Sequence, residues 1–151
     1  MKPDIYINVP EAGTRIARAA GGNPFRMDCG DQCIHREIAG KLAGGVVYYG
    51  YTGQSIRMHV ASFRQRWLSR DLLWVCFDYP FTQLRCQKIF IEIKDTNEAS
   101  LSFAQHLGFK EEHHIKDVYA DGGLVVLAMY RNECRWLDIA PRQLEGVGEN
   151  G

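Results

Sequence analysis

The chain has 151 residues, a length that suits one domain able to bury about two-thirds of its unfolded surface. Eighteen basic and eighteen acidic side chains cancel, so no overall charge attracts nucleic acid or an anionic membrane. The apolar runs are far shorter than the ~20 residues that span a bilayer. Asp4, Asn8 and Glu11 interrupt the start, so we expect no secretory leader there.

The five cysteines are odd in number and scattered along the chain. Cys29 and Cys33 form the only close pair, and no second pair follows at the spacing of a zinc site. We therefore expect reduced thiols, no metal site and a cytoplasmic location.

The first part of the chain predicts a strand, a helix and then a group of strands. Residues 4–9 alternate as a strand, and Pro10 opens a helical stretch that continues to Ala20 and ends at a Gly-Gly-Asn-Pro run. A looser pattern at 25–28 is compatible with another helical turn. Three alternating segments then predict an antiparallel meander, over residues 33–38, 42–51 and 55–63.

A polar and basic loop at 64–71 leads into an apolar helix, predicted from about Leu72 to Leu84. Ser69 is placed to act as its N-cap. Pro80 must kink or shorten this helix, because proline lacks the N–H that the helical ladder needs.

The stretch Lys88–Lys110 carries the most specific pattern in the chain. An alternating strand is followed by a polar turn at 95–97 and a short helix. Gly108 can end that helix in the left-handed conformation, and Phe109 can then fold back onto it. The apolar face of the helix has a spacing of four residues, with Ala99, Phe103 and Leu107.

The remaining sequence predicts a hairpin over 111–119 and 124–130, then a turn at 134–137 that packs on the core. The segment 141–151 is rich in Gly and Glu and is predicted to be a flexible tail. No repeat or linker interrupts the pattern, so we predict one α+β domain over residues 1–140.

Asn97-x-x-Ser100 follows the strand and precedes Leu107-Gly108-Phe109-Lys110, and this motif together with the element order resembles the GCN5-related N-acetyltransferase (GNAT) family. The segment Phe77–Phe81 resembles a helix of the branch that includes ribosomal-protein N-terminal acetyltransferases. The resemblance covers about residues 4–130. It implies a mixed, mainly antiparallel central sheet with splayed middle strands and flanking helices.

Such a protein would be an enzyme that moves an acetyl group from acetyl-coenzyme A to a primary amine of a protein, peptide or small molecule. The amine would attack directly in a ternary complex. In the family, the coenzyme lies between the splayed strands, and its pyrophosphate binds the loop before the next helix. The resemblance thus implies cofactor contacts from strand, loop and helix residues: Val60, Ser62, Arg64, Arg66, Ser69, Arg70, Asn97, Ser100 and Phe103.

The chain departs from the family pattern in the pyrophosphate loop. That loop usually contains glycines, which let the backbone approach phosphate, whereas no glycine occurs here between Gly53 and Gly108. The side chains of Arg64, Arg66 and Arg70 can supply charge for the phosphates instead. The alternative is a solvated basic loop.

A second departure concerns the acid that protonates the leaving thiolate. Many family members carry a tyrosine seven residues after the motif asparagine, where this chain has Ala104. Ser100 is then the candidate for a hydrogen bond near the sulfur, or else an ordinary first-turn serine. Asp95 and Glu98 would form a variant of the capping box, which would leave Asn97 free for a ligand.

The candidates for the catalytic base are Glu92 and His59, each in the middle of a predicted strand. A carboxylate within a central strand is costly unless it is paired or functional. Glu92 can instead pair with Lys94 or Arg57, His59 can be a structural histidine, and a water chain can serve an amine substrate without either.

Three classes of function therefore remain. The leading one is the acetyltransferase, with acetyl-coenzyme A and an amine acceptor as its partners, no membrane, and a homodimer left open. The alternative is a catalytically inactive member of the same fold that acts as a binding or inhibitor protein. Nucleic-acid binding through the basic run at 57–70 is the least favoured, because the chain has no net positive charge.

Overall fold

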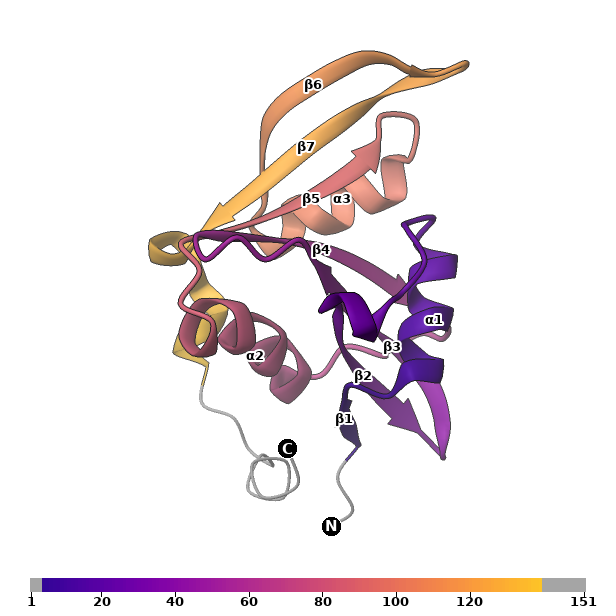
Figure 1. The fold of residues 1–151 in the computed structure, drawn as a ribbon, viewed down its shortest axis with the longest axis vertical. Coiled ribbons are helices and arrows are strands. Elements are labelled where there is room, and N and C mark those ends of the chain that lie inside the picture. Colours follow the sequence, from indigo (N-terminus) through magenta and orange to yellow (C-terminus); the bar gives the residue numbers. More distant parts are fainter. Residues whose placement is uncertain (1–3, 140–151) are drawn as a thin grey trace.

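The computed structural model describes residues 4–139 and contains one seven-stranded sheet in the order β1-β2-β3-β4-β5-β7-β6 (Figure 1). The predicted tail at 141–151 and the predicted domain end at 140 lie outside the described residues. Among the described helices, none is long and apolar enough to cross a membrane. The strands are β1 (Ile5–Ile7), β2 (Gln32–Ile38), β3 (Lys41–Tyr49), β4 (Ser55–Ser62), β5 (Lys88–Lys94), β6 (Lys110–Tyr119) and β7 (Gly122–Tyr130).

The antiparallel meander of β2, β3 and β4 is confirmed, and the later hairpin of β6 and β7 is confirmed too. Strand pairs with turn residues between them fold in this way because the connection is too short for any other geometry. The α+β class with a mainly antiparallel sheet is therefore as predicted.

The two middle strands, β4 and β5, are parallel and pair over only three positions, which end at Arg57 and Phe90. Beyond that point β4 continues to Ser62 with β3 as its partner, while β5 continues to Lys94 with β7 as its partner. The middle strands thus diverge, as the family resemblance implied, and each presents an edge to the gap.

Helix α1 (Pro10–Ala19) covers one face of the sheet, while α2 (Arg70–Asp78) and α3 (Glu98–Leu107) cover the other. The period-two alternation of the strands sends one set of side chains to each face. Ile16 and Ala17 of α1 pack with Val47, and the larger core on the other face includes Leu72 and Phe77 of α2.

Helix α2 begins as predicted and ends earlier. The Ser69 side chain accepts a hydrogen bond from the Leu72 N–H at 3.1 Å, which confirms the N-cap. The α-helix stops at Asp78 and continues only as a π-helical turn (Tyr79–Gln83), not as a regular helix to Leu84. Pro80 explains the early end, because it cannot donate to the carbonyl of Cys76. The buried Tyr48 hydroxyl donates to that carbonyl instead, at 2.5 Å.

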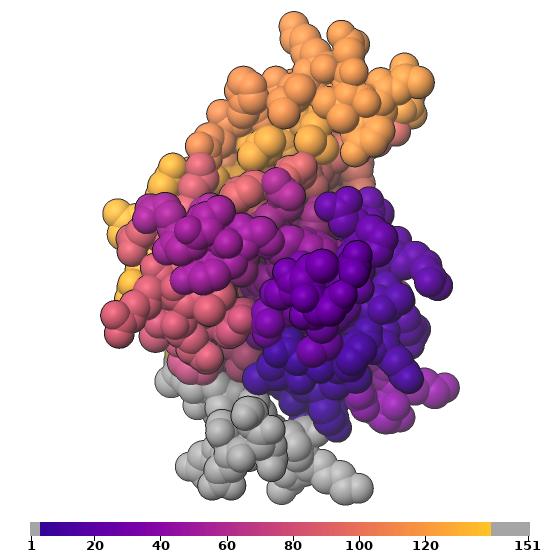
Figure 2. Space-filling view, in the orientation of Figure 1, coloured from indigo at the N-terminus to yellow at the C-terminus, as the bar shows by residue number. Residues whose placement is uncertain are grey.

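Helix α3 ends at Gly108, whose φ of 113° is left-handed, and the Phe109 N–H returns to the Ala104 carbonyl. The predicted final turn packs on this helix, because the Trp136 indole N–H donates to the Leu107 carbonyl at 2.7 Å. All residues of β6 are exposed, and the β6–β7 hairpin stands out from the body of the molecule (Figure 2).

Candidate functional site

A cleft of about 830 Å³ opens where β4 and β5 diverge. Its walls come from both faces of the sheet, from one side of α3 along its length and from the segment 19–23 at the end of α1. A volume of this size is within the range of small-molecule and cofactor sites.

The wall on the α2 and α3 face contains five of the residues predicted to bind the cofactor. Strand β4 and helix α3 bring together Val60, Ser62, Asn97, Ser100 and Phe103. Sequence reasoning did not identify Trp67, which also lines this wall, with its ring 6.2 Å from that of Phe103. The signal in the sequence that could have found Trp67 is Gly44 on β3. An added Cβ at Gly44 would lie 2.4 Å from the Trp67 ring.

The α2 turn, defined here as residues 63–69, leads from β4 into α2. Arg64, Arg66 and Arg70 around it are exposed and do not line the cleft, and Ser69 serves as the helix cap. Arg66 has a left-handed φ of 60°, a conformation that usually falls to glycine. Among the described residues, no acceptor is present for the backbone N–H groups of residues 64–70.

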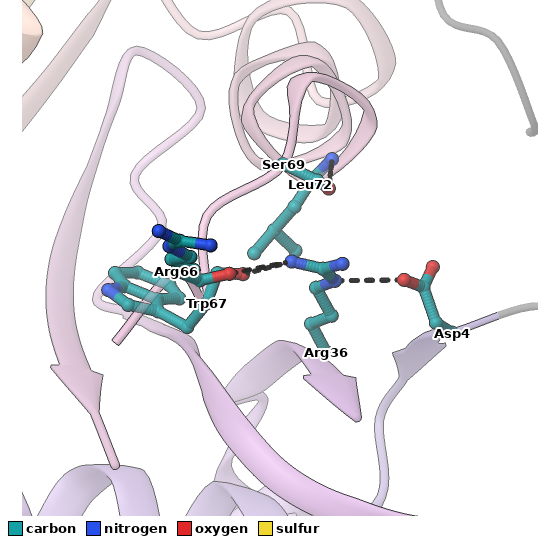
Figure 3. Close-up of polar contacts among 6 residues, drawn as sticks. All are labelled: Asp4, Arg36, Arg66, Trp67, Ser69 and Leu72. Carbon is teal, nitrogen blue, oxygen red and sulfur yellow. Dashed lines mark hydrogen bonds and ion pairs between the residues drawn. The ribbon is translucent and has the colours of Figure 1, made fainter. Parts of the chain in front are cut away.

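Arg36 of β2 holds this turn from outside the cleft (Figure 3). Its Nη1 donates to the carbonyls of Arg66 at 3.1 Å and Trp67 at 2.9 Å, and its Nε donates to Asp4 at 2.8 Å. Sequence reasoning did not identify Arg36, because about thirty residues separate it from the turn and no local pattern joins them.

The α3 turn, defined here as residues 95–97, leads from β5 into α3. Asn97 caps the helix, because its Oδ1 accepts from the Ser100 N–H at 3.2 Å. The predicted capping box of Asp95 and Glu98 is therefore wrong. Asp95 Oδ2 instead accepts the Gly123 N–H at 2.8 Å and lies 2.9 Å from His114 Nε2, so the hairpin has taken the carboxylate that the box required.

The wall on the α1 face contains both residues predicted as bases, His59 and Glu92. The Glu92 carboxylate pairs with Arg57, whose Nε lies 2.5 Å from Oε1. The Arg57 Nε–H is not aligned with that oxygen, so the contact is an ion pair without a formal hydrogen bond. Glu92 is thus neutralised by one of the two partners that the sequence suggested.

No described residue forms an ion pair with His59. Its ring packs edge-on against Tyr49, with the ring centres 5.4 Å apart, and a Cβ on Gly22 would lie 3.4 Å from it. Burial lowers the pKa of the imidazole below its ordinary value; the Glu92 carboxylate opposes this shift and the Arg57 charge adds to it. A lowered pKa keeps the ring neutral near pH 7, which is the form that can accept a proton.

This arrangement can hold an elongated ligand on one face and a proton acceptor on the other. Unpaired strand edges can bind amide groups, and unpaired N–H groups beside a helix N-terminus can bind an anion. Within residues 4–139, no three His, Cys, Asp or Glu side chains gather in a way that would hold a metal ion.

Residues 9–125 match the family described as the acetyltransferase (GNAT) domain. No curated protein sequence matches the chain. Among solved structures, a GNAT-family acetyltransferase from Bacillus anthracis is similar at 12% identity, with a TM-score of 0.64, over 88% of this chain and 98% of the other.

A chimera of the Vibrio cholerae spermidine N-acetyltransferase SpeG and hSSAT is similar at 20% identity, with a TM-score of 0.59. The match covers 71% of this chain and 69% of the chimera. A mutant of the Vibrio enzyme gives a TM-score of 0.60 at 19% identity, over 72% of this chain and 69% of the other. At identities this low, the structural similarity establishes a common fold and no more.

Proposed function

The chain belongs to the GNAT acetyltransferase family, and we propose that it transfers the acetyl group of acetyl-coenzyme A to a primary amine in a ternary complex. The observation that carries this proposal is the divergence of β4 and β5 after Arg57 and Phe90, which opens the cleft. The residues lining that cleft fit the two substrates on opposite faces of the sheet.

The face toward α2 and α3 suits the coenzyme. The edge of β4 beyond Arg57 lacks a β5 partner, so its backbone groups can pair with the amides of the pantetheine arm as with an added strand. The unpaired N–H groups of the α2 turn suit the pyrophosphate. Ser100, one helical turn before Ala104, is the hydroxyl of α3 that lines the cleft, and it is proposed to donate to the leaving sulfur.

The face toward α1 suits the amine. As the C–N bond forms and the C–S bond breaks, the attacking nitrogen loses a proton and the sulfur gains one. We assign His59 as the group that takes the proton from nitrogen, directly or through water, because burial keeps it neutral near pH 7. Glu92 is less suited to this role, because Arg57 holds it as an ion pair.

The charges of the cleft favour an acceptor with a single amine over a polyamine. Its charged lining residues are Arg57, Glu92 and Lys94. Glu92 is paired with Arg57, and Lys94 lies 2.6 Å from Asp121. No unpaired carboxylate among these lining residues awaits the second ammonium of a substrate such as spermidine. A peptide N-terminus, as in the ribosomal-protein branch that the sequence resembles, is the acceptor to test first.

The test combines binding with turnover. Calorimetry should detect coenzyme A binding to the full chain, and thiol release from acetyl-coenzyme A should accelerate with peptide N-termini more than with spermidine. Folded protein that gives no heat at millimolar coenzyme A would leave the inactive binding protein as the better account.

The pH profile tests the base. His59→Gln should lower kcat by about 10²-fold, the lower end of general-base effects. Wild-type activity should fall as the pH drops through the pKa of His59, which burial holds below the ordinary value of about 6.5, and His59→Gln should lose that limb. The limb that belongs to the amine itself should remain. An unchanged profile would exclude His59 as the base.

A further inference from the structure

We propose that Arg36 is the positioning residue of the coenzyme site, and that it does for this chain what glycines do for the pyrophosphate loop of its relatives. This inference rests on the proposed function. It begins from the hydrogen bonds that Arg36 makes to the two successive carbonyls of Arg66 and Trp67 (Figure 3).

These two bonds fix the direction of the next two N–H groups. In a trans peptide the C=O of one residue and the N–H of the next point in opposite directions. Because the carbonyls of Arg66 and Trp67 face Arg36, the N–H groups of Trp67 and Leu68 face away from it. Neither N–H has an acceptor among the described residues.

Two successive N–H groups that point the same way form an anion-binding concavity, and a left-handed residue beside them is its usual backbone signature. Arg66, with its φ of 60°, supplies that residue. The N–H groups point away from Arg36 on β2, and the Trp67 side chain lines the cleft between β4 and β5. A phosphate group of the coenzyme is the ligand that this arrangement fits.

Arg36 itself is built into the fold and does not reach for the ligand. Only 19% of its side chain is exposed, and the Asp4 carboxylate holds its Nε from the other side. Its planar guanidinium can serve both carbonyls and the carboxylate at once, which the single ammonium of lysine does less well. The positive charge behind the two peptides also favours an anion on their N–H side.

The test compares coenzyme A with pantetheine, which lacks the pyrophosphate, by NMR titration of the full chain. Arg36→Met should weaken coenzyme A binding by about 10- to 100-fold, the range for hydrogen bonds to a charged group, and leave pantetheine binding unchanged. Arg36→Lys should give a smaller loss of the same selectivity, and it replaces the methionine variant if that variant fails to fold.

Asp4→Ala is the matched control, because it removes the other contact of Arg36 and leaves the carbonyl contacts in place. It should bind both ligands as the wild type does. If Arg36 served only to join β1 to β2, Asp4→Ala and the Arg36 variants would behave alike, and coenzyme A and pantetheine would weaken together. That result, or unchanged coenzyme A binding in both Arg36 variants, would overturn the inference. Wild-type protein that binds neither ligand would overturn the proposed function first.

Discussion

Two turns leave the diverging strands and enter helices beside the same cleft, yet they are held in opposite ways. At the α2 turn a cation, Arg36, donates hydrogen bonds to backbone carbonyls, and the N–H groups of the turn have no acceptor within residues 4–139. At the α3 turn an anion, Asp95, accepts a hydrogen bond from the Gly123 N–H of the hairpin, and Asn97 accepts one from the Ser100 N–H of the helix. Each turn therefore has a side chain that fixes its backbone.

The difference teaches which turn can accept an anion. The α3 turn carries the Asp95 carboxylate, whose negative charge disfavours a phosphate beside it. The α2 turn offers unpaired N–H groups and a cation behind them. In the proposed account, a helix start thus binds a phosphate in one case, whereas in the other it is joined to the hairpin.

The largest effect should come from a substitution that displaces the α2 turn. Gly44→Ala puts a Cβ 2.4 Å from the Trp67 ring, and overpacking of this kind costs about 1–3 kcal/mol of unfolding free energy. Denaturant unfolding measures that loss, and coenzyme A affinity should fall with it. Adding Trp67→Leu should recover much of the stability, and a double variant as unstable as Gly44→Ala would show that the ring is not the obstacle.

A smaller effect is expected at the α3 turn, and it should depend on pH. The hydrogen bonds from His114 and from the Gly123 N–H lower the pKa of Asp95. A carboxyl group whose pKa is lowered by folding contributes its full stability at pH values above its pKa in the unfolded chain. That stability is lost as the pH falls through the pKa of the folded protein. Asp95→Asn should therefore lower the Tm near pH 7, and the two melting curves should converge in acid.

Asp121→Asn is the control for that experiment, because Asp121 pairs with Lys94 on the surface and its side chain is 74% exposed. Exposed pairs contribute little, so its Tm should stay near that of the wild type. Coenzyme A affinity should be unaffected in both variants. A large loss of affinity in Asp95→Asn would contradict the assignment of the anion site to the α2 turn.

The smallest effect concerns the arginines that the sequence suggested as phosphate ligands. Arg64 and Arg66 are exposed and lie outside the cleft lining, so they can act only through long-range charge. Arg64→Ala with Arg66→Ala should weaken coenzyme A binding by about two- to fivefold at low salt. This difference should fade at high salt, whereas the loss in Arg36→Met should persist.

Arg18→Ala, on helix α1, serves as the control for loss of one exposed positive charge. A large, salt-independent loss in the Arg64 and Arg66 variant would show that these side chains touch the phosphates. The α2 turn would then bind phosphate through its arginine side chains and not through its backbone N–H groups.

Local patterns in the sequence predicted the features that depend on neighbouring residues. The alternation in β5, the Ser69 cap and the left-handed Gly108 need only a few residues of context, and all three are present. The diverging middle strands followed from the family resemblance and not from any local rule.

Features that depend on distant contacts were missed. Either Asp95 or Asn97 could have capped helix α3. Asp95 instead contacts Gly123 and His114 of the hairpin, so Asn97 is the cap. Arg36 reaches the α2 turn across about thirty residues, so no spacing in the sequence marks it. Sequence reasoning placed the candidate site at the two strands between which the cleft opens, and it assigned phosphate binding to the arginines nearest in the chain, which do not line that cleft.

The most direct test is to map amide shifts on the folded chain with coenzyme A and, separately, with pantetheine. The account predicts that both ligands shift the amides of Ser100 and Phe103 in α3, and that only coenzyme A shifts those of Trp67 and Leu68. Shifts that distinguish the two ligands at Glu98 and the α3 turn, with Trp67 and Leu68 unmoved, would contradict it.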